Sequence, residues 1–234
     1  MLIEPGVPDD TCEYCRTGRY NICPGVDFMA TQPNYKGALT QYMTHPEEWT
    51  YHIPEGMTTM EGALVEPAAV GMHAAVLGGA QPGKSIVILG GGTIGLMVLQ
   101  ACISLGATDI TVVDVIEKRL ELAKKLGAAR VINGKEEDTV ARIMELTGGR
   151  GFDLGIETAG SQITASQLIK GANKGATIVF VGYSASGEMT LPIGMALDKE
   201  LTFKTVFRYR NIYPMQSMQL LPENQYQRYR NRLL

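Results

Sequence analysis

The segment ILGGGTIG, residues 88–95, constrains the fold of this chain more than any other. It carries the spacing G-x-G-x-x-G at Gly90, Gly92 and Gly95, between the β-branched run SIVIL and the uncharged, helix-length run TIGLMVLQACISLG. A strand, a glycine turn and a helix in this order are typical of the first βαβ unit of a dinucleotide-binding sheet. In such a unit Gly90 permits the tight turn, Gly92 lets the backbone approach a pyrophosphate, and Gly95 lets the helix pack against the strand.

An acidic residue extends this pattern. Asp114 ends the apolar run ITVVD, about 20 residues after Gly95. A carboxylate there can accept hydrogen bonds from the hydroxyls of an adenosine ribose and would repel a 2′-phosphate, so the sequence favours NAD over NADP. The alternative is a structural glycine turn with a surface aspartate, because 27 of the 234 residues are glycine and the motif alone is weak.

From about residue 72 onward, short apolar runs alternate with helix-length runs. We predict strands at 85–90, 109–115, 129–133, 151–160, 176–184 and 200–207, with helices at 93–106, 117–127, 136–148 and 161–175. This alternation predicts an α/β fold with a Rossmann doubly wound parallel six-stranded sheet. Before about residue 70, proline and glycine interrupt the chain every few residues, which predicts a β-rich unit of short strands and loops.

Charge and hydropathy exclude several classes of protein. The net charge is −3 and no long Lys/Arg run occurs, which disfavours a nucleic-acid or membrane partner. We interpret the basic residues Arg228, Arg230 and Arg232 as a solvated end. The uncharged stretch 85–107 is long enough to span a membrane, but the glycines at positions 90, 91, 92 and 95 favour a buried strand, turn and helix. The first residues do not follow the pattern of a signal peptide, so we expect a cytoplasmic protein.

Three of the four cysteines lie close together in the segment DDTCEYCRTGRYNIC, at Cys12, Cys15 and Cys23. In a reducing compartment, clustered cysteines favour a metal site over disulfides. A tetrahedral zinc site needs a fourth ligand, which the cysteines alone do not supply.

Taken together, these residues resemble the zinc-dependent medium-chain alcohol dehydrogenases, and among them the sorbitol (polyol) dehydrogenase branch. The resemblance runs from about Leu2 to Pro214 and is carried by the segments EPGVP, CEYCRTGRYNIC, DFMAT, EGALVEP, GGGTIG, VVDVIEKRLELAKKLGA, ETAG and FRYRNIYP. It implies a GroES-like catalytic domain followed by a Rossmann domain, and hydride transfer between a secondary alcohol and NAD(P).

The resemblance also implies roles for individual residues on the cofactor side. The positions that match cofactor contacts of the family are Gly90, Gly92, Thr93, Ile94, Gly95, Asp114, Arg119, Val181, Gly182, Tyr183, Phe207 and Arg208. The first five match the pyrophosphate loop, and the next two match the adenosine-ribose contacts. The segment 181–183 matches the stretch under the nicotinamide.

On the substrate side, the resemblance implies catalytic roles for Glu66, which would face a catalytic zinc or its water, and for Arg208 and Tyr209, which would orient substrate hydroxyls. Phe28 matches a position of the substrate pocket. The alternatives are an acidic residue before a proline for Glu66, a surface cation for Arg208, and core aromatics for Phe28 and Tyr209. His45, His52 and His73 match no ligand position and are interpreted as structural or surface residues. Cys102 lies on the apolar face of a predicted helix and is interpreted as a small core residue.

The family's structural-zinc lobe reads C-x₂-C-x₂-C-x₇-C, and here the first position is Asp9, followed by Cys12, Cys15 and Cys23. A carboxylate can replace a thiolate on zinc, so a three-thiolate, one-carboxylate site is predicted. The family's catalytic zinc is held by a cysteine and a His-Glu pair that would precede Leu2. Only Glu66 of that set matches here, so we expect the catalytic zinc to be absent from this chain.

We therefore expect a chain truncated at both ends. Residues 1–70 would be a partial GroES-like catalytic domain with the structural-zinc lobe, 71–214 the Rossmann NAD-binding domain, and 215–234 a divergent polar tail. One interpretation is a zinc- and NAD-dependent enzyme acting on a polyol or secondary alcohol, assembled as a homodimer or homotetramer. Another is an inert NAD(H)-binding fragment, which we favour for the chain as printed. A zinc-free quinone or enoyl reductase is a third, disfavoured by the cysteine cluster and ALVEP.

Overall fold

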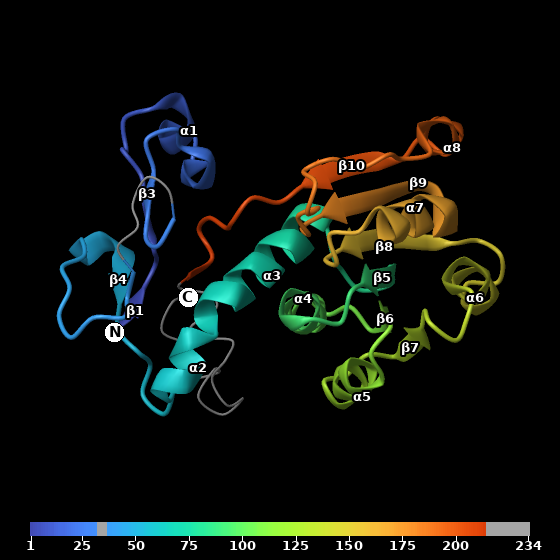
Figure 1. Cartoon of the computed structure of the whole chain (residues 1–234), viewed down its shortest axis with the longest axis horizontal. Coiled ribbons are helices and arrows are strands. Elements are labelled where there is room, and N and C mark those ends of the chain that lie inside the picture. The colour runs from blue at the N-terminus through green and yellow to red at the C-terminus, as the bar shows by residue number, and fades with distance from the viewer. Residues whose placement is uncertain (32–36, 214–234) are drawn as a thin grey trace. The chain divides into compact units, whose positions relative to one another are not determined.

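The computed structural model describes residues 1–31 and 37–213 and divides the chain into two compact units (Figure 1). We call Met1–Ala69 together with the segment from Phe207 the N-terminal unit, and Val70–Val206 the sheet unit. The sheet unit thus ends ahead of residue 214, where the Rossmann domain was predicted to end. The predicted tail 215–234 lies outside the described residues.

Six strands form the sheet unit's single sheet. They are β5 (Ser85–Leu89), β6 (Asp109–Asp114), β7 (Arg130–Asn133), β8 (Phe152–Glu157), β9 (Ala172–Phe180) and β10 (Thr202–Thr205). Their order is β10-β9-β8-β5-β6-β7, and every neighbouring pair is parallel. This is the doubly wound Rossmann order, which confirms the predicted fold class. The predicted homodimer or homotetramer stays a prediction.

Helices cover both faces of this sheet. They are α3 (Val65–Gly78), α4 (Thr93–Ser104), α5 (Glu117–Lys125), α6 (Thr139–Leu146), α7 (Gln162–Gly171) and α8 (Ile193–Asp198). In Figure 1, α4 and α5 lie on one side of the sheet and α6 and α7 on the other, as right-handed crossovers in opposite directions require. Every residue of β5 is buried, because Val87 and Leu89 face the core beneath α6 and α7 while Ile86 and Ile88 face the opposite side.

The N-terminal unit is built from short elements. Strand β1 (Leu2–Ile3) pairs with β4 (Thr50–Tyr51), and β2 (Gly6–Val7) pairs with β3 (Asp27–Phe28), both antiparallel. The helical elements are α1 (Glu13–Arg16), η1 (Tyr20–Ile22), η2 (Glu47–Trp49) and α2 (Thr59–Ala63). Short strands joined by irregular segments agree with the predicted β-rich unit over its first 55 or so residues.

Two sequence predictions were wrong. Residues 59–70 were assigned to strands and loops, but α2 and the start of α3 occupy them. The overlooked signal is the capping box at Thr58 and Glu61, in which the Thr58 side chain accepts from the Glu61 N–H and the Glu61 carboxylate accepts from the Thr58 N–H. Pro67 misled the assignment, since in the first turn of α3 its missing N–H costs no helical hydrogen bond.

The second error concerns the end of α7. The helix was predicted to run to residue 175, but it ends at Gly171, and Ala172 already pairs with Phe152 as the first residue of β9. The ammonium group of Lys199 donates to the carbonyls of Ile169, Lys170 and Ala172 at 3.1, 2.8 and 2.9 Å. A cation therefore satisfies the last carbonyls of α7 from a distant part of the sequence, which no local pattern indicates.

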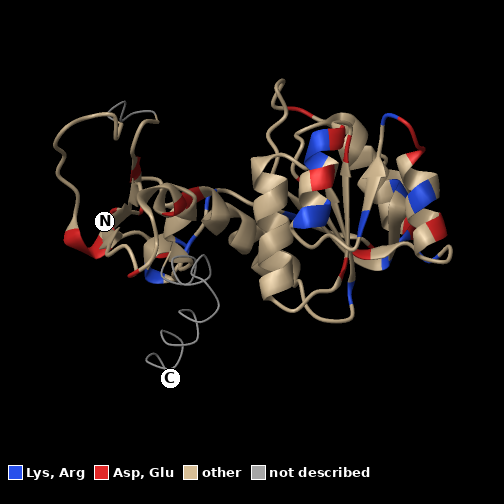
Figure 2. Cartoon of the chain, turned by 90° about the horizontal axis from the view of Figure 1, so that it is seen from below, with Lys and Arg blue, Asp and Glu red and all other residues tan. Residues whose placement is uncertain are grey.

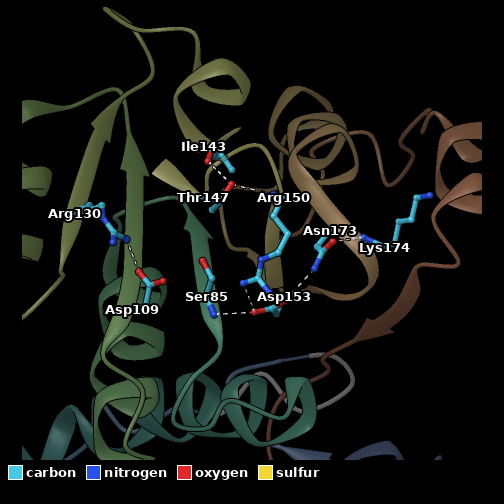
Figure 3. Close-up of polar contacts among 10 residues, drawn as sticks. Ser85, Asp109, Arg130, Ile143, Thr147, Arg150, Asp153, Asn173 and Lys174 are labelled. Carbon is cyan, nitrogen blue, oxygen red and sulfur yellow. Dashed lines mark hydrogen bonds and ion pairs between the residues drawn. The ribbon is translucent and has the colours of Figure 1, made fainter. Parts of the chain in front are cut away.

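Polar side chains tie the strands together at their amino ends (Figure 3). The Asp153 carboxylate accepts from the Ser85 N–H at 3.1 Å and from the Asn173 amide at 3.3 Å, and it pairs with Arg150 at 3.4 Å. Asp109 and Arg130 form an ion pair between β6 and β7. These side-chain contacts join neighbouring strands at their amino ends. At the carboxyl ends of the strands, the loops lie free of this network.

Charged residues of both signs are interspersed along the described chain (Figure 2). None of the described helices has the length and apolar character needed to cross a bilayer, in agreement with the assignment of 85–107 to a strand, turn and helix.

The buried central strand supports a stability prediction. Ile156 in β8 is fully buried, so Ile156→Ala should lower the free energy of unfolding by about 2–5 kcal/mol, through lost burial and the cavity left behind. Ile163→Ala is the matched control, because Ile163 on α7 is 69% exposed and should change stability by less than about 0.5 kcal/mol. Urea unfolding followed by circular dichroism measures both. Equal effects would contradict the assigned core.

Candidate functional site

The carboxyl ends of β5 and β8 meet where the strand order reverses, which in open α/β sheets is the place where ligands bind. Gly90 follows β5 with φ +106°, a conformation that favours glycine. The Thr158 hydroxyl, just after β8, donates to the carbonyls of Leu89 and Gly90 at 3.0 Å each. The glycine turn is therefore anchored to the neighbouring strand.

The other two motif glycines act on the two sides of the turn. A Cβ on Gly95 would lie 1.8 Å from the Gly90 carbonyl oxygen, so α4 can approach the turn only with glycine there. A Cβ on Gly92 would meet no atom within 4 Å, so it would point into open space above the start of α4. Gly92 caps this helix without a side chain, which leaves the N–H groups of Thr93 and Ile94 available to a phosphate.

Asp114, the last residue of β6, joins the glycine loop to the next helix. Its carboxylate accepts from the Gly91 N–H at 2.7 Å and from the N–H groups of Val115 and Ile116 at 2.8 and 2.9 Å. Arg119, on α5, lies 3.4 Å from the same carboxylate and is about half exposed. These bonds place a fixed negative group beside the loop, at the position expected to contact a ribose.

The segment 181–183 begins directly after β9, at the same edge of the sheet. The N–H groups of Val181 and Gly182 donate to the Glu157 carbonyl at 2.9 and 3.1 Å, and the Tyr183 side chain is 78% exposed. The ten predicted cofactor residues of the sheet unit therefore lie at or just after the carboxyl ends of β5, β6 and β9 or on α4 and α5, the helices that follow β5 and β6.

Phe207 and Arg208, also predicted to contact the cofactor, group with the N-terminal unit instead. The Arg208 guanidinium lies over the Phe28 ring at 3.8 Å and over the Phe207 ring at 4.6 Å, and Arg208 adopts φ +55°. The contacts of the N-terminal unit thus bring Phe28 together with Phe207 and Arg208, which lie far from it in the sequence.

The segment between Cys15 and Cys23 holds the loop that carries Arg208. The Asn21 amide donates to the Phe207 carbonyl at 2.8 Å, and the Asn211 N–H donates to the Tyr20 hydroxyl at 2.6 Å. Tyr20 in turn donates to the buried carboxylate of Glu4 at 2.8 Å. The sequence did not indicate that Glu4, Tyr20 and Asn21 hold the loop of Arg208, although EPGVP and GRYNIC were among the segments that carried the resemblance.

Glu66, in the first turn of α3, is half-buried. Burial raises the pKa of its carboxyl, and the nearby Tyr209 hydroxyl partly offsets that rise. Tyr209 itself is buried, which raises the pKa of its hydroxyl. A cavity of about 400 Å³ within the N-terminal unit is lined by Glu66 together with Met29 and Tyr213. Two of the predicted catalytic residues, Glu66 and Tyr209, are therefore near each other in the N-terminal unit.

Asp9, Cys12, Cys15 and Cys23 form one cluster, in which four potential ligand atoms lie within 4.8 Å of one another. The sulfurs of Cys12 and Cys15 are 3.4 Å apart, and the Cys15 sulfur is 3.6 Å from Asp9 Oδ1. Donors from the Cys12 and Thr11 N–H groups lower the pKa of Asp9 to about 2, so it is a carboxylate at neutral pH. Three sulfurs and one carboxylate oxygen at this spacing fit a tetrahedral zinc ion.

No second group of this kind occurs within residues 1–31 and 37–213. Glu66 is not joined there by two further potential ligands, so the described residues do not fit a catalytic zinc at that position. A single carboxylate does not complete a zinc site.

This cluster supports a metal-binding prediction. The purified chain should retain about one zinc per molecule, and Asp9→Asn should weaken zinc binding about tenfold or more, because it removes an anionic ligand. The affinity should fall as the pH is lowered, since the thiols must lose protons to bind the metal.

Glu13→Gln is the matched control, since it makes the same charge change on an exposed side chain one residue after Cys12. Metal analysis after gel filtration, with a competing chelator titrated in, measures both variants. Less than about one-tenth of a zinc per wild-type chain would contradict the assigned site.

Comparisons with known proteins agree with this architecture. The family model for zinc-binding dehydrogenases matches residues 93–223, more than half of the chain, and that for the alcohol dehydrogenase GroES-like domain matches residues 2–55. An uncharacterized zinc-type alcohol dehydrogenase-like protein of Escherichia coli is 57% identical, over 91% of this chain and 61% of its own length. Sorbitol dehydrogenase of Bacillus subtilis is 40% identical, over 92% of this chain and 60% of its own.

A crystal structure of an oxidoreductase/dehydrogenase of unknown specificity from Escherichia coli superposes with a TM-score of 0.89 and 56% identity, covering 92% of this chain and 61% of that one. The chain thus spans about 60% of the length of the relatives that it matches. The predicted resemblance is confirmed: the chain belongs to the zinc-binding alcohol dehydrogenase family, with a Rossmann sheet and part of a GroES-like domain.

Proposed function

We propose that this chain binds NAD(H) along the carboxyl edge of its parallel sheet, as part of a dehydrogenase that transfers hydride between NAD and a polyol or secondary alcohol. The observation that carries the proposal is the open cradle at Gly92, bordered by the start of α4 and by the Asp114 carboxylate. Glycine without a Cβ, free helix N–H groups and a nearby ribose acceptor are what a dinucleotide requires.

Each part of the cofactor has a place in this proposal. The pyrophosphate would lie against Gly92, Thr93 and Ile94, where the helix dipole stabilises negative charge. The adenosine ribose hydroxyls would donate to Asp114, and Arg119 would border the same pocket. A 2′-phosphate at this place would meet the Asp114 carboxylate, which supports NAD rather than NADP.

Residues of the N-terminal unit would serve the substrate. Arg208 supplies a guanidinium that lies over the Phe28 and Phe207 rings, and the buried Tyr209 hydroxyl is near the Glu66 carboxyl. Such donors and acceptors suit a molecule with several hydroxyl groups, as the name of the sorbitol dehydrogenase relative also suggests. Zinc in the cysteine cluster would stabilise the fold of the lobe, and NAD when bound would accept the hydride.

The cofactor proposal predicts the effect of one carboxylate. Asp114→Asn should weaken NADH binding about tenfold, because it removes the charge that accepts the ribose hydroxyls while keeping an oxygen for the neighbouring N–H groups. Asp109→Asn is the matched control, since Asp109 opens the same strand at its opposite end. Titration of NADH fluorescence measures both. A wild-type chain without a saturable signal, or equal losses in both variants, would contradict the proposal.

A second candidate is a binding module that holds NAD(H) without turnover. It is favoured because, within the described residues, Glu66 belongs to no group of three or more potential zinc ligands. The two candidates differ in one measurement: sorbitol or xylitol with NAD and zinc yields NADH continuously from an enzyme and not from a binding module. For the chain as printed we expect saturable NADH binding and no sustained absorbance change at the NADH band. Sustained turnover that is lost in Arg208→Ala would instead establish the dehydrogenase.

A further inference from the structure

Glu157, the last residue of β8, is a fully buried acidic residue that none of the predicted cofactor contacts uses. Burying a carboxylate is costly unless hydrogen bonds replace its lost hydration. The segment ETAG that begins with it was singled out in the sequence, but its residues received no role. The hydrogen-bond partners of the Glu157 carboxylate therefore indicate why position 157 is acidic.

The carboxylate is surrounded by donors from the loop after β8. Its Oε1 accepts from the Ala159 N–H at 2.9 Å and from the Thr164 hydroxyl at 2.7 Å, and its Oε2 accepts from the Gly160 N–H at 3.0 Å. Bonds from N–H groups to a carboxylate are roughly twice as strong as bonds between neutral groups. The side chain thus determines the conformation of residues 158–160 and the approach of α7.

The same residue also holds the loop after β9. Its backbone carbonyl accepts from the N–H groups of Val181 and Gly182 at 2.9 and 3.1 Å. A Cβ on Gly160 would lie 2.1 Å from the Tyr183 carbonyl oxygen, and a Cβ on Gly182 would lie 2.2 Å from the Gly160 nitrogen. The two loops therefore fit together without space for side chains, and Glu157 hydrogen bonds with both.

A dinucleotide binds across the point where the strand order reverses, with one half on each side. Asp114 on β6 marks the adenosine side, so the other half, the nicotinamide, would lie toward β8 and β9. We propose that Glu157 is a positioning residue for the nicotinamide half of the cofactor, because it orders the loops 158–160 and 181–183 against each other. This inference rests on the proposed binding of NAD(H).

The test compares NADH with ADP-ribose, which shares everything except the nicotinamide ring. Glu157→Gln keeps the size of the side chain but turns an amide N–H₂ toward a backbone N–H, so at least one bond is lost. We expect the dissociation constant of NADH to rise about tenfold and that of ADP-ribose to change less than about twofold. Glu145→Gln, an exposed glutamate on α6, is the matched control and should change neither.

A second variant distinguishes a local change at Glu157 from misfolding of the chain. Thr164→Val removes the hydroxyl that contacts Oε1 and the Ser161 carbonyl, leaves the carboxylate in place, and should shift the NADH dissociation constant in the same direction by a smaller factor. Calorimetry measures all constants, and circular dichroism checks each variant for its fold. Equal loss of both ligands in folded variants, or no loss of either, would overturn the positioning role. A wild-type chain that binds neither ligand would overturn the proposed function itself, a separate result.

Discussion

The sheet unit depends on the close approach of α4 to the turn that follows β5. A Cβ on Gly95 would lie 1.8 Å from the Gly90 oxygen, so the contact exists only because position 95 is glycine. That contact places the helix N-terminus directly over the end of the strand, and it leaves open space beside Gly92. The absence of a Cβ at position 95 therefore brings the positive N-terminus of α4, its accessible N–H groups and the open space beside Gly92 to one place. The proposed cofactor site consists of these three features.

The two edges of the sheet serve different purposes. At the amino edge, Asp153 links the starts of β5 and β9, and Asp109 pairs with Arg130, so side chains satisfy one another there. At the carboxyl edge, Asp114 and Glu157 accept backbone N–H groups of loops instead. Acidic residues thus stabilise the sheet at one end and shape loops at the other, where a ligand can use the resulting geometry.

In the N-terminal unit, the lobe between Cys15 and Cys23 links a candidate metal centre to the loop of Arg208. Asn21 and Tyr20 bind the backbone on either side of this arginine, which itself adopts a left-handed conformation. A residue at φ +55° is held there by its surroundings rather than by preference. The segment between the second and third cysteines of the cluster thus supplies the contacts that hold this loop.

The sequence by itself determined the glycine turn, Asp114 and the six strands, because each depends on local spacing, β-branched content or a residue's own steric limits. It also indicated the cysteine lobe with Asp9 in place of the first thiol. Tertiary structure alone decided the end of α7, the contacts of Asn21 and Tyr20 with residues 207–211, and the double role of Glu157. Those features depend on donors and acceptors brought together from distant segments. Pairing of that kind leaves no periodic pattern along the chain, since it arises only once the backbone has folded.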